Sequence, residues 1–126
     1  MLRGLFNLIL PKNSVEQQQA EAHRAVLREA AKIGGTVFGP IPEGVRREFF
    51  CLDERTWVWH EEWTDGSKVH HARTTRYDVR PHGIFKAQDG QPYRPISKDE
   101  AVTLYRAVDA YNEAVDAYFL PRLATA

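Results

Sequence analysis

Glu61 and His71 are the two residues whose types and positions could perform acid–base chemistry. They stand on either side of a turn signal at residues 64–67, so two antiparallel strands would bring their side chains together. Trp59 and Trp63 share a face with Glu61 in an extended strand, and an apolar wall raises the pKa of a carboxyl group. Because an imidazole titrates near neutral pH, the pair is a candidate general acid–base site.

The register of this hairpin decides which polar groups meet. A three-residue loop at 65–67 would place Glu61 opposite His71, whereas a two-residue turn at 65–66 would place Glu61 opposite His70. A slip of one residue moves every side chain of a strand to the other face, so the two registers predict different sites. In the first register the facing pairs are Trp63 and Val69, Glu62 and His70, Glu61 and His71, and Trp59 and Arg73.

An aromatic strip surrounds this pair. All three tryptophans of the chain lie at odd-numbered positions of one predicted strand, and alternate side chains of a strand share a face. Trp, Tyr and Arg side chains dominate binding energy where they cluster. The candidate binding residues are therefore Trp57, Trp59, Trp63, Arg73, Tyr77 and Tyr111.

These residues favour a non-enzymatic binding or interaction module that uses the aromatic and arginine-bearing sheet face. Its partner would be another protein or a small ligand. If the partner is a protein, it could be a second copy of this chain, which would make a homodimer. The competing hypothesis is a small enzyme that uses Glu61 and His71 in a pocket between the sheet and the last helix. No nucleophile, triad or cofactor motif accompanies the pair, so we favour binding and predict no cofactor.

Metal ligands are available in the same region, but their spacing is unfavourable. His70 and His71 point to opposite faces of a regular strand, and the chain has no pair of histidines at metal-binding helical spacing and only one cysteine. We therefore predict no metal site. The side chains considered were His60, Glu61, Glu62, His70, His71 and His82.

Charge argues against nucleic acid as a partner. Seventeen basic and seventeen acidic residues give zero net charge, which removes the long-range attraction on which non-specific nucleic-acid binding relies. Arg73 and Arg76 also lie on opposite faces of their predicted strand, so they do not form one patch.

Two helices enclose the strand region. Ser14 and Gln17 form a capping box, which predicts a helix over 14–33 that ends at Gly34. Ser97 and Glu100 form a second capping box, which predicts a helix over 97–120. We expect Pro121 to end this helix. Its apolar stripe consists of Leu104, Tyr105, Val108, Tyr111, Val115, Tyr118 and Phe119.

Residues 45–96 carry strand signals separated by short turns, which predicts an antiparallel meander of four to five strands. The predicted fold is a single α+β domain over 1–126, with the long C-terminal helix packed on one face of the sheet. This order of elements is loosely similar to that of cystatin-like folds, which carries no function with it.

The N-terminal segment 1–12 places its apolar residues on one helical face, and we expect Pro11 to stop that helix. We favour docking of residues 2–10 on the domain or on a second copy over contact with a membrane, because Arg3 is the only cation on its polar face. The lone Cys51 lies in an apolar stretch and predicts a buried residue in a reducing compartment, hence a cytoplasmic location.

Overall fold

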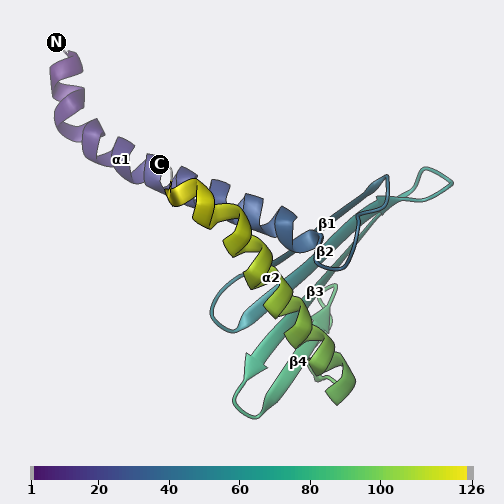
Figure 1. Cartoon of the computed structure of the whole chain (residues 1–126). Helices are drawn as coiled ribbons and strands as arrows, with labels where there is room; N and C mark the ends of the chain where they lie inside the picture. The colour runs from purple at the N-terminus through teal and green to yellow at the C-terminus, as the bar shows by residue number, and fades with distance from the viewer. Residues whose placement is uncertain (1, 125–126) are drawn as a thin grey trace.

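The computed structural model describes the backbone of residues 2–124 and the side chains of residues 14–124. Five antiparallel strands form one open sheet in the order β1-β2-β3-β4-β5, so consecutive strands are neighbours. This arrangement is the predicted α+β meander, and Figure 1 shows α2 running across the sheet while α1 extends away from it. The elements are α1 (Leu2–Gly35), β1 (Val45–Cys51), β2 (Thr56–Thr64), β3 (His70–Arg80), β4 (Gly83–Gln88), β5 (Arg94–Pro95) and α2 (Lys98–Ala124).

Helix α2 begins as its capping box predicts, because the Glu100 N–H donates to Ser97 Oγ at 3.2 Å. From there it packs against the sheet through Leu104, Ala107 and Tyr111, which are buried in the same cluster as Phe49 of β1. We call this side of the sheet the concave face. Three further members of the predicted stripe, Val108, Val115 and Phe119, also contact this core, whereas Tyr105 is 60% exposed and does not widen the stripe.

Helix α1 ends on the free edge of β1. Directly after β1, the Leu52 N–H donates to Thr56 O at 2.8 Å. Hydrogen bonding alternates along an antiparallel pair, so the even-numbered residues of β1 bond to β2 and the carbonyl groups of the odd-numbered residues point away from β2. A side chain at Gly34 would overlap the carbonyl oxygen of Phe49, and one at Gly35 would overlap that of Arg47. The two glycines therefore allow the helix to approach the strand, in addition to ending the helix as predicted.

Both helices continue through a proline at which we expected them to stop. α1 is continuous from Leu2 to Gly35, so the predicted boundary at Pro11 is wrong, and the side chains of the 2–10 stripe lie outside the described residues. α2 continues past Pro121 to Ala124, although a proline cannot donate the helical hydrogen bond. In that last turn the Arg122 side chain donates from Nη1 to the Tyr118 carbonyl at 2.6 Å.

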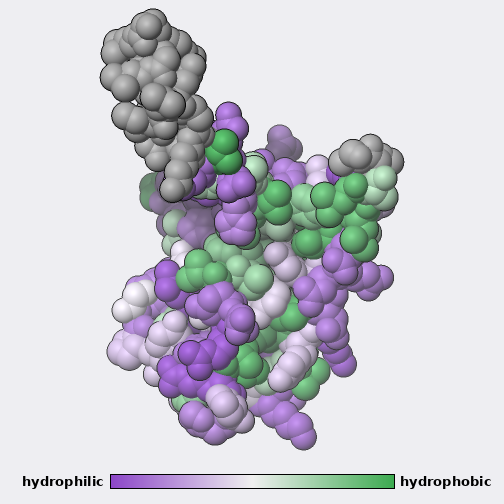
Figure 2. Space-filling model, turned by 90° about the vertical axis from the view of Figure 1, so that its left-hand side faces the viewer, coloured by the Kyte–Doolittle hydropathy of each residue, from purple (hydrophilic) through white to green (hydrophobic). Residues whose placement is uncertain are grey.

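Apolar side chains remain exposed on both helices. Val26 of α1 is 48% exposed, and Leu120 and Leu123 of α2 are 60% and 67% exposed. Figure 2 shows hydrophobic surface toward the C-terminal end of the chain. The homodimer expected from the sequence stays a prediction.

Within residues 2–124, neither helix combines the length and the apolar character needed to cross a membrane.

Candidate functional site

The hairpin between β2 and β3 has a register that differs from both predictions. The Asp65 N–H donates to Val69 O and the Lys68 N–H donates to Asp65 O, each at 2.9 Å, so the loop consists of residues 66–68. A three-residue loop was one of the two predictions, but the observed loop starts one residue later than the predicted one. Each residue of β2 therefore faces a residue of β3 that is two positions further along the chain than predicted. A shift of two keeps every side chain on its predicted face. The observed pairs are Trp63 and His71, Glu61 and Arg73, Trp59 and Thr75, and Trp57 and Tyr77.

Asp65 holds the loop in this position. Its Oδ1 accepts hydrogen bonds from the Ser67 and Val69 N–H groups at 2.8 and 3.0 Å. Its Oδ2 lies 2.7 Å from His71 Nε2. The hydrogen bond with His71, followed by that from the Val69 backbone, lowers the pKa of Asp65.

The predicted pairing of Glu61 with His71 is therefore wrong. Glu61 Oε2 instead accepts a hydrogen bond from Arg47 Nε of β1 at 3.0 Å. His71 is bonded to Asp65 and stacks on Trp63 with ring centroids 5.4 Å apart. Both residues remain on the concave face, but each has a partner other than the one expected.

The aromatic strip changes its environment along β2. Trp57 packs edge-on against Tyr111 at 5.1 Å and stacks on Phe49 at 5.2 Å, so it belongs to the core beneath α2. Trp59 stacks on Phe38, with centroids 4.4 Å and planes 8° apart.

Trp63 is next to the last residue of β2, at the rim of the sheet, and is not among the residues packed in the core with α2. The Arg73 guanidinium is 5.8 Å from its ring centre and makes a cation–π contact with it, although the predicted register had placed Arg73 opposite Trp59. Tyr111, predicted as a binding residue, is buried against Trp57 and Phe49. Burial and the neighbouring Cys51 raise the pKa of Tyr111 to about 12.

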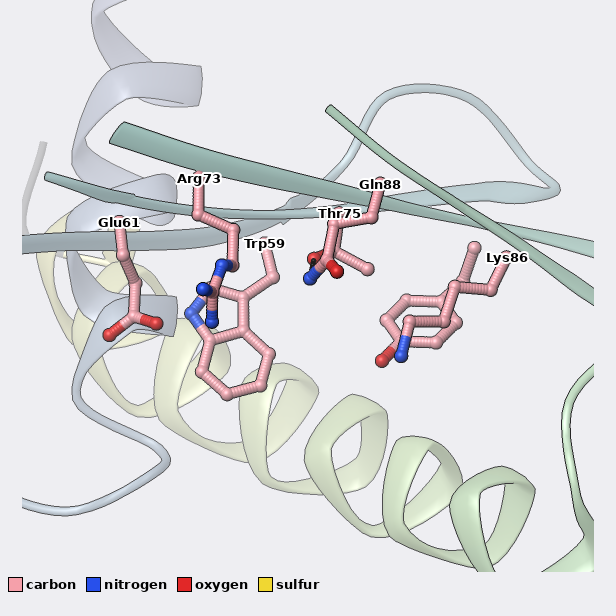
Figure 3. Close-up of a pocket in the computed structure, with 7 residues that line it drawn as sticks. Trp59, Glu61, Arg73, Thr75, Lys86 and Gln88 are labelled. Atoms are coloured by element: carbon pink, nitrogen blue, oxygen red, sulfur yellow. Dashed lines mark hydrogen bonds between the residues drawn. The ribbon is translucent and has the colours of Figure 1, made fainter. Parts of the chain in front are cut away.

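A cavity of about 110 Å³ opens on the concave face beside Trp59. Figure 3 shows that the six labelled side chains all project from the sheet toward α2. Four predicted site residues meet here, namely Trp59, Glu61, Arg73 and Tyr77. The full lining is Trp59, Glu61, Arg73, Thr75, Tyr77, Lys86 and Gln88.

One wall of this cavity is a hydrogen-bonded ionic group. The Tyr77 hydroxyl donates to Glu100 Oε2 at 3.0 Å, and Lys86 Nζ lies 2.9 Å from the same oxygen. Burial, together with Glu100, raises the pKa of Tyr77 far above its ordinary range. Burial alone would raise the pKa of Glu100 as well, but the hydrogen bonds from Lys86 and Tyr77 outweigh it and the pKa lies below its ordinary value.

The indole N–H of Trp59 is the feature that sets this cavity apart. Among the described residues, Trp59 Nε1 is the one buried side-chain nitrogen or oxygen that has no hydrogen-bond partner. Its neighbour Thr75 is only 5% exposed, yet Thr75 Oγ1 accepts a hydrogen bond from Gln88 Nε2 at 3.0 Å. More than nine in ten buried polar groups are paired in folded proteins, so a buried indole N–H without a partner, on a tryptophan that lines a cavity, marks a candidate site.

The predicted site residues did not include Thr75, Lys86 and Gln88, which line the cavity, or Phe38 and Glu100, which contact residues of the lining. Phe38 lies in the loop after α1, where no periodic pattern indicates the direction of a side chain. Gln88 faces Thr75 in the pairing of β3 with β4, and strand alternation would have placed it on the concave face had that register been known. Glu100 was recognised only as a capping residue.

The opposite face of the sheet carries a separate polar cluster. His60 Nε2 and His70 Nε2 lie 2.8 and 3.1 Å from the two oxygens of Glu62, and His60 Nδ1 lies 2.7 Å from Thr74 Oγ1. The hydrogen bond with His60 is the largest cause that lowers the pKa of Glu62. In the part of the chain that the structure describes, no three His, Cys, Asp or Glu side chains are arranged to hold a metal ion.

A wider groove of about 600 Å³ lies between the end of α1 and the start of β1. Arg28, Lys32 and Arg46 line it and are exposed to solvent. No described side-chain atom that lacks a partner is buried there, so the cavity beside Trp59 remains the stronger candidate.

Comparison of the chain with models of protein families, with curated proteins and with solved structures gave no match.

Proposed function

We propose that this protein is a non-enzymatic binding module that takes a small ligand in the cavity beside Trp59. The observation that carries the proposal is that Trp59 lines this cavity while its buried indole N–H has no hydrogen-bond partner among the described residues. A buried donor without a partner costs about 1–3 kcal/mol, and a ligand atom that accepts this hydrogen bond would recover much of that cost.

The surroundings of Trp59 also support binding. Phe38 stacks on one face of its ring and holds the indole in place, which reduces the entropy lost when a ligand is bound. Arg73 and Gln88 offer further polar groups around the same opening. A few polar groups that converge on an aromatic wall are typical of small-ligand sites.

The positions of Glu61 and His71 favour binding over the enzyme alternative. A general acid–base pair acts through a shared proton path, whereas these two side chains have separate partners in Arg47 and Asp65. An acid that neutralises a neighbouring arginine is poorly suited to accept a substrate proton.

The three indole N–H groups give a direct test, because each produces its own ¹H–¹⁵N NMR signal. Benzamide is a suitable probe, since its carbonyl accepts hydrogen bonds and its ring is flat. We expect benzamide to move the Trp59 indole signal more than those of Trp57 and Trp63. The Trp59→Phe variant should lose this binding, whereas Arg76→Gln, on the opposite face of β3, should keep it. If neither benzamide nor benzoate moves the Trp59 signal, the proposed function is wrong.

We also propose a cytoplasmic location. The support is the single cysteine, because one cysteine forms no disulfide within the chain and persists as a thiol in reducing compartments. Fractionation of cells that express the tagged protein would test this.

A further inference from the structure

We propose that the group recognised beside Trp59 is an anion, specifically the carboxylate of a small organic acid. This inference rests on the binding function proposed above and adds the chemical class of the ligand. The juxtaposition that carries it is that Arg73 and Trp59 line one cavity, while within the described residues Arg73 has no ion-pair partner and the buried indole N–H of Trp59 has no hydrogen-bond partner.

The charges around the cavity leave a positive excess. Glu61 is held by Arg47 at 3.0 Å, and Glu100 is held by Lys86 at 2.9 Å. Within the described residues, Arg73 forms no ion pair with a carboxylate, and its closest described interaction is the cation–π contact with Trp63. Each acid near the opening thus has a cation of its own, and the charge of Arg73 remains for a ligand.

The hydrogen-bonding groups that remain around the cavity are mainly donors. An amide nitrogen carries two N–H groups, and Gln88 uses one of them toward Thr75, so the other is available. The Thr75 hydroxyl accepts from Gln88 and keeps its own proton to donate. Together with Trp59 and Arg73, these groups suit an ionised carboxylate, which only accepts hydrogen bonds.

Arginine strengthens this preference through its geometry. A guanidinium presents parallel N–H groups that match the two oxygens of a carboxylate, and such charge-assisted bonds are about twice as strong as neutral ones. Glu61 lines the same cavity, but its carboxylate is engaged by Arg47 on the β1 side. The carboxylate of the ligand is therefore expected between Arg73 and Trp59.

The size of the cavity limits the ligand. A volume of about 110 Å³ corresponds to roughly four water molecules at about 30 Å³ each, which suffices for a carboxylate and a few attached carbons. Any larger body must extend past Arg73, which is exposed, toward the rim where Trp63 and His71 stack. A small aromatic acid such as benzoate is therefore an appropriate probe.

Benzoate and benzamide have nearly the same shape and differ in charge, so their comparison isolates the carboxylate. We expect benzoate to move the Trp59 indole signal with a dissociation constant at least tenfold lower than that of benzamide. In Arg73→Gln this preference should disappear while benzamide still binds, and in Arg76→Gln it should persist. Added salt should weaken the binding of benzoate more than the binding of benzamide, since only benzoate binding depends on charge.

Each other outcome has a definite meaning. Equal affinities for the two probes, or a benzoate preference that survives in Arg73→Gln, would overturn the inference and leave the binding function standing. If benzylammonium binds more tightly than benzoate, the inference is overturned as well, because the cavity would then recognise a cation through Glu61. A Trp59 signal that responds to none of the three probes would overturn both proposals. The ¹H–¹⁵N spectra of the variants without ligand show whether each variant keeps the native fold.

Discussion

Arg47 on β1 donates a hydrogen bond from Nε to Oε2 of Glu61 on β2, across 3.0 Å. The side chains of Arg47 and Glu61 are only 14% and 22% exposed, so water compensates each charge poorly. The two residues face each other in the pairing of β1 with β2, so their ion pair links the two strands on the concave face.

Neutralising Glu61 should destabilise the protein. In Glu61→Gln, Arg47 loses its counter-charge in a half-buried position, and we expect a loss of about 1–3 kcal/mol in the free energy of unfolding. Urea unfolding near neutral pH measures this loss, with Glu113→Gln on the exposed side of α2 as the control for a change in charge. A Glu61→Gln protein as stable as the native one would show that the pair contributes nothing.

Glu100 should make stability depend on pH in the acid range. Its pKa is lowered in the folded protein from an ordinary value of 4.5, so the stabilisation is present above that value and is lost as pH falls through the folded pKa. In Glu100→Gln the group no longer titrates. The difference in stability between the two proteins should be largest near about pH 6 and should shrink below about pH 4. Thermal unfolding measured over this range tests the sign, and a difference that grows toward acid pH would contradict it.

A methyl group at Gly34 should force α1 away from β1. The added Cβ would overlap the Phe49 carbonyl, which is backbone and cannot rotate aside. Overpacking of this kind costs about 1–3 kcal/mol, so Gly34→Ala should lower the unfolding free energy by that amount. Gly66→Ala is the matched control, because a Cβ at Gly66 meets open space. Equal stabilities of the two variants would mean that the helix does not need this close approach.

The hairpin loop contains one strained residue. Lys68 has a φ of 63°, a conformation that glycine adopts without strain and that other residues adopt at a cost of about 1–2 kcal/mol. We therefore expect Lys68→Gly to stabilise the protein by up to about 1 kcal/mol, after the greater freedom of glycine in the unfolded chain is counted. Ser67→Gly serves as the control and should not be stabilising. A destabilised Lys68→Gly protein would indicate that the lysine side chain, and not the backbone, sets the loop.

The same loop explains where prediction from sequence succeeded and where it failed. Strand alternation placed the tryptophans, Glu61 and Arg73 on one face correctly, since that pattern depends only on the period of a strand. The pairing failed because the loop places Lys68 in the conformation favoured by glycine, while Gly66 occupies an ordinary one. Asp65 compensates through three hydrogen bonds, a tertiary detail that residue preferences do not contain.

Other parts of the site depended on contacts that are distant in the sequence. The order of the strands and the capping box at Ser97 follow from local signals, and Ser97 does cap α2. The capping box predicted at Ser14 is wrong, because α1 runs without a break from Leu2 to Gly35. Phe38 contacts Trp59, and Glu100 contacts Tyr77, only because the loop after α1 and the first turn of α2 meet over the same sheet. Their roles follow from the packing of the helices and from no local pattern.

The contact of Gly34 and Gly35 with β1 also limits how this protein can meet a partner. Strand addition requires an open edge whose carbonyl groups can accept new hydrogen bonds, and α1 covers the carbonyls of Arg47 and Phe49. At the other edge of the sheet, β5 has two residues, and one of them, Pro95, has no N–H to offer. Both borders are therefore protected against edge-to-edge aggregation, and the binding that we propose would use a face of the sheet instead of its hydrogen-bonding backbone.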